Sequence, residues 1–233
     1  MKETGEAPVI IDKKKAERSK ERLSGFYYNN GFIKNEVTLS IDSVGKKKGK
    51  ITYKVITGKP YFIDSIFKII ETPIIDTLYA REEKKSFIKK GDQYNYTNFD
   101  IERKRITQYL RNNGVYHFQE SNVRYDAIHD DSTQKMNVNI KIEDRLVKKG
   151  DTLVKRPFSV YKISQVNIFT NNTSRKERNQ FNDSVTYKNF NIYSAGKLKY
   201  KPKAITNAIF IEKGKLFSDN DRTLTSKSLS NLK

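Results

Sequence analysis

The chain has 233 residues, 36% of them hydrophobic and 12% aromatic, which is enough apolar side chain for several small cores and excludes wholesale disorder. The length allows two to three domains of about 75 to 100 residues each. The absence of cysteine excludes disulfide bonds and thiolate metal sites, and no apolar run approaches the ~18 residues of a membrane-spanning helix.

The formal charge of +19 is unevenly distributed along the chain. Residues 1–144 carry 27 Lys and Arg against 21 Asp and Glu, a net +6, whereas residues 145–233 carry 19 against 6, a net +13. A basic excess of this size indicates anionic partners, either nucleic acid or phospholipid headgroups. The alternative is a Lys-rich and Asn-rich surface that only keeps the protein soluble.

The first predicted element is a helix over residues 12–29, for which Asp12 is a suitable cap. Its apolar inner stripe consists of Leu23, Phe26 and Tyr27. Gly31 ends the helix, because glycine adopts the left-handed conformation without a Cβ penalty. Strands over 36–41 and 51–56 then form a hairpin.

A second and complete unit follows Gly58-Lys59-Pro60, with its first strand over 61–69. Thr72-Pro73 begins a helix as cap and first-turn proline, and its apolar stripe consists of Ile75, Leu78 and Tyr79. Asn98 is the predicted cap of a second helix that ends at Asn113-Gly114. Strands over 122–128 and 136–142 close the unit, with a turn over 130–133. The predicted order is β-α-α-β-β.

A third unit begins with a strand over 161–169. An insert over about 170–202 separates this strand from a helix over 203–209, and Asp219 or Asp221 caps a last helix. No closing strand pair follows, so the unit is expected to lack the centre of its sheet. The chain is therefore expected to be part of something longer.

The insert itself contains two segments of strand-like composition, over residues 185–193 and 197–200. They flank Ala195-Gly196, which is a turn signal, and they favour an extra hairpin.

Several of these elements are repeated within the chain, which indicates an array of small α+β units. The segment from Arg105 to Gly114 has the plan of Arg22 to Gly31, 83 residues upstream. Lys213-Gly214 precedes apolar residues at the same offsets as Lys90-Gly91. The strand that begins at Tyr61 has its counterpart at Tyr161, where Tyr61, Ile63 and Ile66 align with Tyr161, Ile163 and Val166.

The β-α-α-β-β order, the helix ending in Asn-Gly before an aromatic residue, and the junction Gly58-Lys59-Pro60-Tyr61-Phe62-Ile63-Asp64-Ser65-Ile66 resemble POTRA (polypeptide-transport-associated) domains. These are the periplasmic repeats that precede the barrel in BamA- and TamA-type outer-membrane assembly proteins. The resemblance covers residues from about 12 to the end, and the long insert is similar to the extended form of Bacteroidetes relatives. Each motif is weak alone, but their repeated order is fairly specific.

The resemblance implies an α+β fold of tandem units, each a three-stranded mixed sheet covered by two helices, with the first and last units incomplete. The expected units are residues 1–58, 59–146 and 147–233. It also implies a periplasmic scaffold on the outer membrane, not an enzyme. The expected partners are unfolded outer-membrane proteins, accessory periplasmic or lipoprotein subunits, and a C-terminal β-barrel outside this segment.

In this family the third strand of a unit is central and the second lies at an edge. A sheet edge can accept an extended peptide as an added strand, because backbone hydrogen bonds supply affinity without demanding a particular sequence. The candidate edge residues are Val37, Thr38, Leu39, Ser40, Ile41, Val123, Arg124, Tyr125, Asp126, Ala127 and Ile128.

A candidate basic surface lies in the more basic half of the chain and consists of Lys197, Lys199, Lys201 and Lys203. In the family this end leads towards the barrel and the inner leaflet of the outer membrane. An anionic lipid surface is therefore a possible partner.

No catalytic, cofactor or metal site is expected. His117 and His129 lack a second ligand at metal spacing. Asp130-Asp131 lies in a predicted turn, where Asp favours local backbone hydrogen bonds. The three lysines between Gly45 and Gly49 lack the other residues of a phosphate-binding loop.

Nucleic-acid binding is the alternative function, because 14 tyrosines among 46 basic residues could stack on bases and contact phosphates. The sequence lacks an RNP-type aromatic strand and a Gly-x-x-Gly clamp, and the repeat order favours export. A salt titration against a random oligonucleotide discriminates between the two functions.

Overall fold

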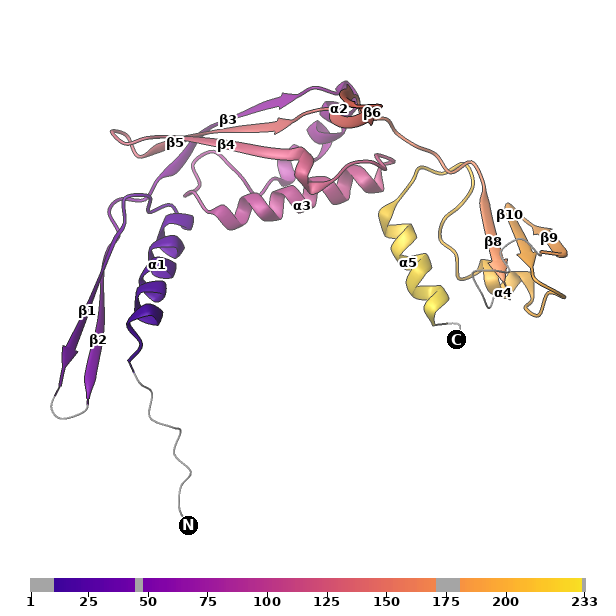
Figure 1. The fold of residues 1–233 in the computed structure, drawn as a ribbon. Helices are drawn as coiled ribbons and strands as arrows, with labels where there is room; N and C mark the ends of the chain where they lie inside the picture. Colours follow the sequence, from indigo (N-terminus) through magenta and orange to yellow (C-terminus); the bar gives the residue numbers. More distant parts are fainter. Residues whose placement is uncertain (1–10, 45–47, 171–180, 232–233) are drawn as a thin grey trace, which may run out of the picture. The chain divides into compact units, whose positions relative to one another are not determined.

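The computed structural model describes residues 11–44, 48–170 and 181–231. The fold is α+β, as predicted, with short helices and small sheets along the chain (Figure 1). Two compact units are present: one contains Met1–Lys68, Ser86–Glu102 and Tyr125–Ile140, and the other contains Ile69–Lys85, Arg103–Arg124 and Lys141–Lys233. The predicted division into 1–58, 59–146 and 147–233 stays a prediction.

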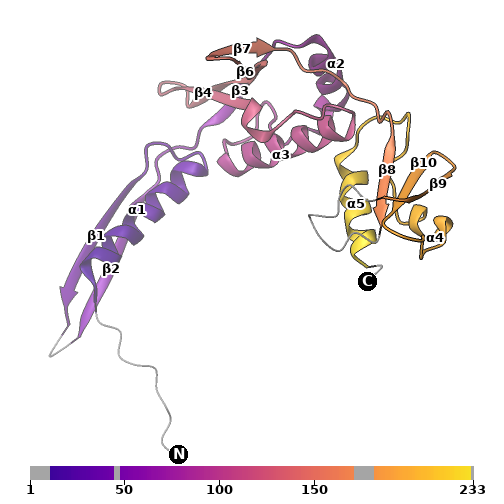
Figure 2. The same cartoon turned by 45° about the vertical axis from the view of Figure 1, so that its right-hand side comes forward.

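The chain first forms one helix and one hairpin: α1 (Lys13–Asn29), β1 (Glu36–Ser43) and β2 (Gly49–Ile56). Asp12 caps α1 as predicted, since its carboxylate accepts the amides of Lys14 at 2.9 Å and Lys15 at 3.2 Å. The two strands are antiparallel, and α1 runs alongside them in both views (Figures 1 and 2). The Tyr53 hydroxyl on β2 donates to the Ala16 carbonyl at 3.2 Å.

The predicted inner stripe of α1 is partly wrong. Phe26 is 59% exposed, whereas Ala16 is buried and Leu23 and Tyr27 are half-buried. A two-stranded hairpin covers only a narrow strip of a helix, so it accommodates a small residue such as Ala16 closely and leaves Phe26 outside.

The middle of the chain contains the elements β3 (Phe62–Ile70), α2 (Pro73–Glu82), η1 (Glu83–Lys85), α3 (Tyr96–Asn112), η2 (Glu120–Asn122), β4 (Val123–Asp130) and β5 (Lys135–Ile142). Apart from two short 3-10 turns, this is the predicted β-α-α-β-β order. The strand order is β3-β5-β4, so the third strand is central and the second lies at an edge.

The sheet is mixed. The Phe62 amide donates to the Gln134 carbonyl at 3.0 Å, and the Glu71 amide donates to the Ile142 carbonyl at 3.1 Å. The first bond joins the start of β3 to the start of β5, and the second joins the end of β3 to the end of β5, so these two strands are parallel. The tight turn after Asp130 makes β4 and β5 antiparallel.

The buried side chains of this region follow the expected periods. On β5 every second residue is buried, namely Met136, Val138, Ile140 and Ile142. On α3 the buried apolar residues are Phe99, Ile106 and Leu110, and Leu110 is fully buried. The predicted stripe of α2 is confirmed, since Ile75, Leu78 and Tyr79 are buried.

The cap predicted for α3 is wrong. The helix begins at Tyr96, and the Asn95 side chain accepts the Thr97 amide at 2.9 Å. Asn98 therefore lies inside the first turn, because Asn95 provides the same side-chain acceptor three residues earlier.

The remaining elements are β6 (Arg145–Lys149), β7 (Thr152–Arg156), β8 (Val166–Thr170), β9 (Asp183–Tyr187), β10 (Phe190–Ser194), α4 (Pro202–Thr206) and α5 (Asp219–Ser230). The antiparallel β6–β7 hairpin was not predicted. The predicted strand over 161–169 is shortened to β8, and only Lys162 near its start forms a bridge, with Leu216.

The last sheet has the order β8-β10-β9, with β10 parallel to β8 and antiparallel to β9. The expectation that this unit lacks the centre of its sheet is therefore wrong. The central strand comes from the insert, of which residues 171–180 lie outside the described part. Because β8 offers an unpaired backbone edge, the nearest hairpin in the chain pairs with it.

Two local predictions in this region are also wrong. The hairpin turns at Lys188-Asn189, where Lys188 has φ +52°, and not at Ala195-Gly196. Ser218, not Asp219 or Asp221, caps α5 by accepting the Asp221 amide at 3.1 Å. The two aspartates lie in the first turn instead, where their negative charges interact favourably with the positive end of the helix dipole.

Candidate functional site: repeat junctions and sheet edges

The first repeat junction forms where the chain after α1 meets the start of β3. Gly31 has φ +89°, and its carbonyl oxygen accepts the amide of Tyr61 at 2.9 Å. A Cβ added to Gly31 would lie 2.7 Å from the Tyr94 carbonyl oxygen. This position therefore needs glycine both for its backbone conformation and for the close approach of another segment.

The second repeat junction has the same geometry after α3. Gly114 has φ +90°, and its carbonyl oxygen accepts the amide of Tyr161 at 2.9 Å. A Cβ on Gly114 would lie 2.6 Å from Val160 Cγ1. The repeat that the sequence indicates is thus also a repeat of backbone contacts.

The equivalence extends into the segments that begin at Tyr61 and Tyr161. The carbonyl oxygen of Tyr61 accepts the amide of Tyr94 at 2.9 Å, and the carbonyl oxygen of Tyr161 accepts the amide of Phe217 at 2.8 Å. Each segment also has a glycine amide that donates at 2.7 Å to the isoleucine two residues after the tyrosine; the pairs are Gly91 with Ile63 and Gly214 with Ile163.

Side chains at the first junction gather around Asp131. Its carboxylate accepts the Tyr61 hydroxyl at 2.7 Å and forms an ion pair with Lys34 at 2.8 Å. His129 lies 3.4 Å from the same carboxylate, and its ring contacts that of Tyr61 edge-on. These contacts connect the chain after α1 to the turn of the β4–β5 hairpin.

The charges around Asp131 shift the pKa values of both hydrogen-bonded groups. The bond to Asp131, assisted by burial, raises the pKa of Tyr61 to about 12. The bonds from Lys34 and Tyr61 lower the pKa of Asp131. Asp130 has the local role that the sequence predicts: bonds from Ser132 and Thr133 lower its pKa to about 2.

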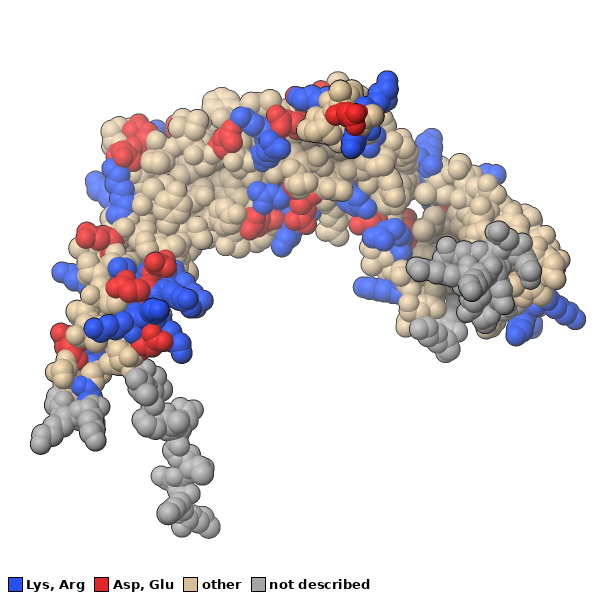
Figure 3. Space-filling view, viewed as in Figure 1, with Lys and Arg blue, Asp and Glu red and all other residues tan. Residues whose placement is uncertain are grey.

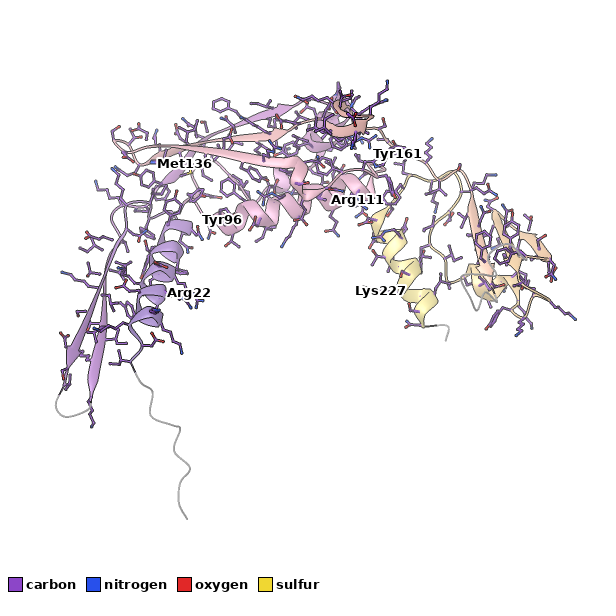
Figure 4. All side chains as sticks on the ribbon, viewed as in Figure 1. Arg22, Tyr96, Arg111, Met136, Tyr161 and Lys227 are labelled. Atoms are coloured by element: carbon purple, nitrogen blue, oxygen red, sulfur yellow. The ribbon has the colours of Figure 1, made fainter. Side chains whose placement is uncertain are left out.

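At the second junction the central side chain is Arg111 (Figure 4). Its guanidinium donates to the carbonyls of Tyr116 at 2.8 Å and Phe118 at 3.0 Å, and to the Asp219 carboxylate at 3.0 Å. It also lies over the Phe217 ring. The bond from Arg111 is the main reason that the pKa of Asp219 is lowered.

His117 lies at this junction as a packing residue. Its ring contacts those of Tyr116 and Tyr161. Burial, with the nearby charges of Arg145 and Arg111, lowers the pKa of His117. Within the described ranges, no group of three or more His, Cys, Asp or Glu side chains could hold a metal ion.

Thr72 has a role that the sequence did not indicate. It occupies the predicted N-cap position before Pro73, the first residue of α2, but its hydroxyl makes no capping bond to the helix. The hydroxyl donates to the Asp144 carboxylate and accepts the Phe158 amide at 3.0 Å. The buried Thr72 therefore connects the start of α2 to the chain that follows β5 and to the chain that follows β7.

The predicted edge residues lie on two strands. Val37–Ile41 belong to β1, which forms a two-stranded sheet with β2 among the described residues, and Val123–Ile128 belong to β4, an edge strand of its sheet. On β4, Val123 is buried and the residues from Asp126 to Asp130 are exposed. The other edge strand of this sheet is β3, which was not among the predicted edges.

The four lysines of the predicted basic surface are exposed and flank or enter α4. On the face seen in Figure 3, basic and acidic side chains lie together over α1. Basic side chains that lie among acidic ones do not indicate an anionic partner, so only a local excess of basic over acidic residues does. No helix in the described part of the chain combines the length and apolarity required to span a bilayer.

Comparisons with solved structures give POTRA domains of BamA and Omp85 proteins. The chain is similar to POTRA3-5 of BamA from Haemophilus influenzae, with 14% identity, a TM-score of 0.45, and 93% of this chain and 68% of that one covered. It is similar to POTRA1-3 of the periplasmic domain of Omp85 from Anabaena, with 11% identity, a TM-score of 0.29, and coverage of 94% and 71%.

A third similar structure is the N-terminal domain of Omp85 from Thermosynechococcus elongatus, with 10% identity, a TM-score of 0.30, and coverage of 98% and 76%. No protein-family model and no curated protein matches the chain.

Proposed function

We propose that this chain is a POTRA-type scaffold on the periplasmic side of the outer membrane, where it receives unfolded barrel proteins by strand addition. The observation that carries the proposal is the position of β4 at the edge of a β3-β5-β4 sheet. An edge strand presents a row of outward backbone donors and acceptors, which an extended chain of almost any sequence can pair with.

The repeat junctions support this function because they fix where the edge is presented. Asp131 in the turn after β4 is bonded to Tyr61 and Lys34, which belong to the segments that precede β3. A scaffold has to hold its binding edge in place while the substrate remains disordered, and these bonds hold the end of β4. Accessory subunits and a following β-barrel complete the proposed assembly.

The test is strand addition at β4, measured with two neighbouring proline variants, Ala127→Pro and Ile128→Pro. In an antiparallel ladder adjacent residues direct their amides alternately inward and outward. One variant therefore removes an amide that faces β5, and the other removes an amide on the open edge. Thermal melts identify which variant has lost the outward-facing amide: that variant should be the more stable of the two, because proline is tolerated on the open side of an edge strand.

The probe is a fluorescent peptide of alternating apolar and polar residues, taken from a barrel strand. The stable proline variant should bind it about fivefold more weakly for each hydrogen bond of ~1 kcal/mol that is lost. A peptide with alternate N-methylated amides is the control and should not bind. Equal binding of the normal peptide to wild type and to both proline variants would contradict strand addition at β4.

A further inference from the structure

The β6–β7 hairpin, whose ribbon is labelled in Figure 2, combines exposed leucines with a high density of basic residues. Leu146 is 60% exposed and Leu153 is 66% exposed. Of the twelve residues Arg145–Arg156, five are basic and one, Asp151, is acidic, which gives the hairpin a net charge of +4. Exposed apolar side chains among cations on a short hairpin indicate a contact surface.

The strand register places both leucines on the same face. Leu146 is opposite Lys155, and Lys148 is opposite Leu153. Directly opposed residues, and residues two apart, project from one face of an antiparallel ribbon. Each leucine is therefore a diagonal neighbour of the other, and lysine side chains occupy the alternate corners.

The base of this face is fixed to the rest of its compact unit. Lys155 forms an ion pair with Glu71 at 2.6 Å, and the Asp144 amide, just before β6, donates to the same carboxylate at 2.8 Å. Toward the tip, Lys148, Lys149 and Leu153 are exposed. The hairpin is thus an anchored ribbon with an apolar and cationic outer part.

We propose that the β6–β7 hairpin binds the surface of an anionic lipid bilayer, with Leu146 and Leu153 in the acyl boundary and Lys148, on the same face, at the headgroup phosphates. Lys149, opposite Thr152 on the other face near the tip, adds to the attraction of the hairpin for the anionic surface. Lysine stems lie along apolar surface while the ammonium groups reach outward, which suits this interface. An acidic peptide would neutralise the lysines but leave the leucines in water. An anionic bilayer accepts both, so the observations favour lipid.

This inference is independent of strand addition, because it uses another hairpin and needs no protein substrate. The chain has no tryptophan, so Leu153→Trp introduces a single fluorescent reporter. With vesicles of phosphatidylcholine and phosphatidylglycerol at low salt, its emission should shift to shorter wavelength. Vesicles of phosphatidylcholine alone should give a much smaller shift. Ile56→Trp, at an exposed apolar position on β2, is the matched control and should not shift.

Two further variants separate the apolar from the charged contribution. Leu146→Thr with Leu153→Thr should reduce vesicle flotation at both low and high salt, and Lys148→Gln with Lys149→Gln should reduce it mainly at low salt. Far-ultraviolet circular dichroism verifies that each variant is folded. Flotation of both variants at the wild-type level, or an equal emission shift for Ile56→Trp, would overturn the proposal. A shift caused by a polyglutamate peptide but not by vesicles would assign the surface to acidic proteins instead.

Discussion

The carbonyl oxygen of Gly114 accepts the backbone amide of Tyr161 at 2.9 Å. The same bond, also at 2.9 Å, joins Gly31 to Tyr61 at the earlier junction. The glycine that ends a helix in one repeat thus receives the first strand segment of the next. Glycine is required at both positions because of its positive φ and the close approach of another segment, whereas the backbone bond itself does not depend on the tyrosine side chain.

Gly31→Ala should destabilise the protein more than Gly91→Ala. Both glycines have a φ near +90°, so both variants carry the left-handed strain of about 1–2 kcal/mol. A Cβ at Gly31 would also meet the Tyr94 carbonyl oxygen at 2.7 Å, whereas nothing lies within 4 Å of a Cβ at Gly91. Denaturant unfolding measures both free energies, and equal losses would show that close approach at the junction is unimportant.

Leu110→Ala should lower the free energy of unfolding by about 2–5 kcal/mol, because a fully buried leucine is removed from a small core. Gln108→Ala, on the exposed side of the same helix, should change it by about 0.5 kcal/mol or less. Urea titrations of both variants provide the comparison. A loss below about 0.5 kcal/mol for Leu110→Ala would contradict its place in the core.

The elements that the sequence predicted well are those with a local physical cause. Gly31 and Gly114 could be identified because a left-handed residue that ends a helix is nearly always glycine. The β5 strand could be identified because its apolar residues alternate strictly. In these cases one residue type or one period is enough to determine the local structure.

The β6–β7 hairpin was missed because its pattern is not amphipathic. Leu146-Val147 and Leu153-Val154 are adjacent apolar pairs beside basic residues, so the alternation of apolar and polar residues that marks a half-buried strand is absent from the sequence. The insert strands were misplaced for another reason: Ala195-Gly196 is the stronger turn signal in sequence, but the turn is at Lys188-Asn189. Pairing with β8, a long-range contact, determines that register, and local sequence does not contain it.

The candidate site was predictable only in outline. The edge position of β4 came from the family resemblance, and the strand order places β4 there. The bonds of Asp131 to Tyr61 and Lys34 join residues distant in sequence, so no spacing rule could indicate them. Binding at the edge itself stays a proposal.

Tyr61 should ionise near pH 12, about two units above an ordinary tyrosine. Because its folded pKa is raised, the hydroxyl contributes stability that is complete below pH ~10 and is lost as the pH rises toward 12. Ultraviolet absorbance of tyrosinate, as the difference between wild type and Tyr61→Phe, measures this pKa. Asp131→Asn should lower it markedly and Asp130→Asn only slightly, since the hydrogen bond to Asp131 is the main cause. An unchanged pKa in Asp131→Asn would show that this bond does not form.

A double-mutant cycle should show that Asp219 couples more strongly to Arg111 than to Arg222. Both arginines contact the same carboxylate, at 3.0 Å and 2.9 Å. The Arg111 side chain is 21% exposed and that of Arg222 is 58% exposed, so solvent screens the second pair more. Coupling of roughly 1 kcal/mol or more is expected with Arg111, against about 0.2–0.5 kcal/mol for the exposed pair. Similar couplings, measured by urea unfolding, would mean that Arg111 acts only through its carbonyl bonds.

Changing Lys197, Lys199, Lys201 and Lys203 together to Glu should weaken flotation with anionic vesicles at low salt. These exposed lysines belong to the half of the chain with a net +13, and each basic group near an anionic bilayer contributes roughly 1 kcal/mol. Changing Lys84, Lys85, Lys89 and Lys90 to Glu is the control, because it alters the net charge equally in the less basic half and should have a smaller effect. Retained binding at high salt would indicate a nonelectrostatic contact. If wild type fails to float at low salt, or if both quadruple variants lose flotation equally, the four lysines are not a membrane-facing surface.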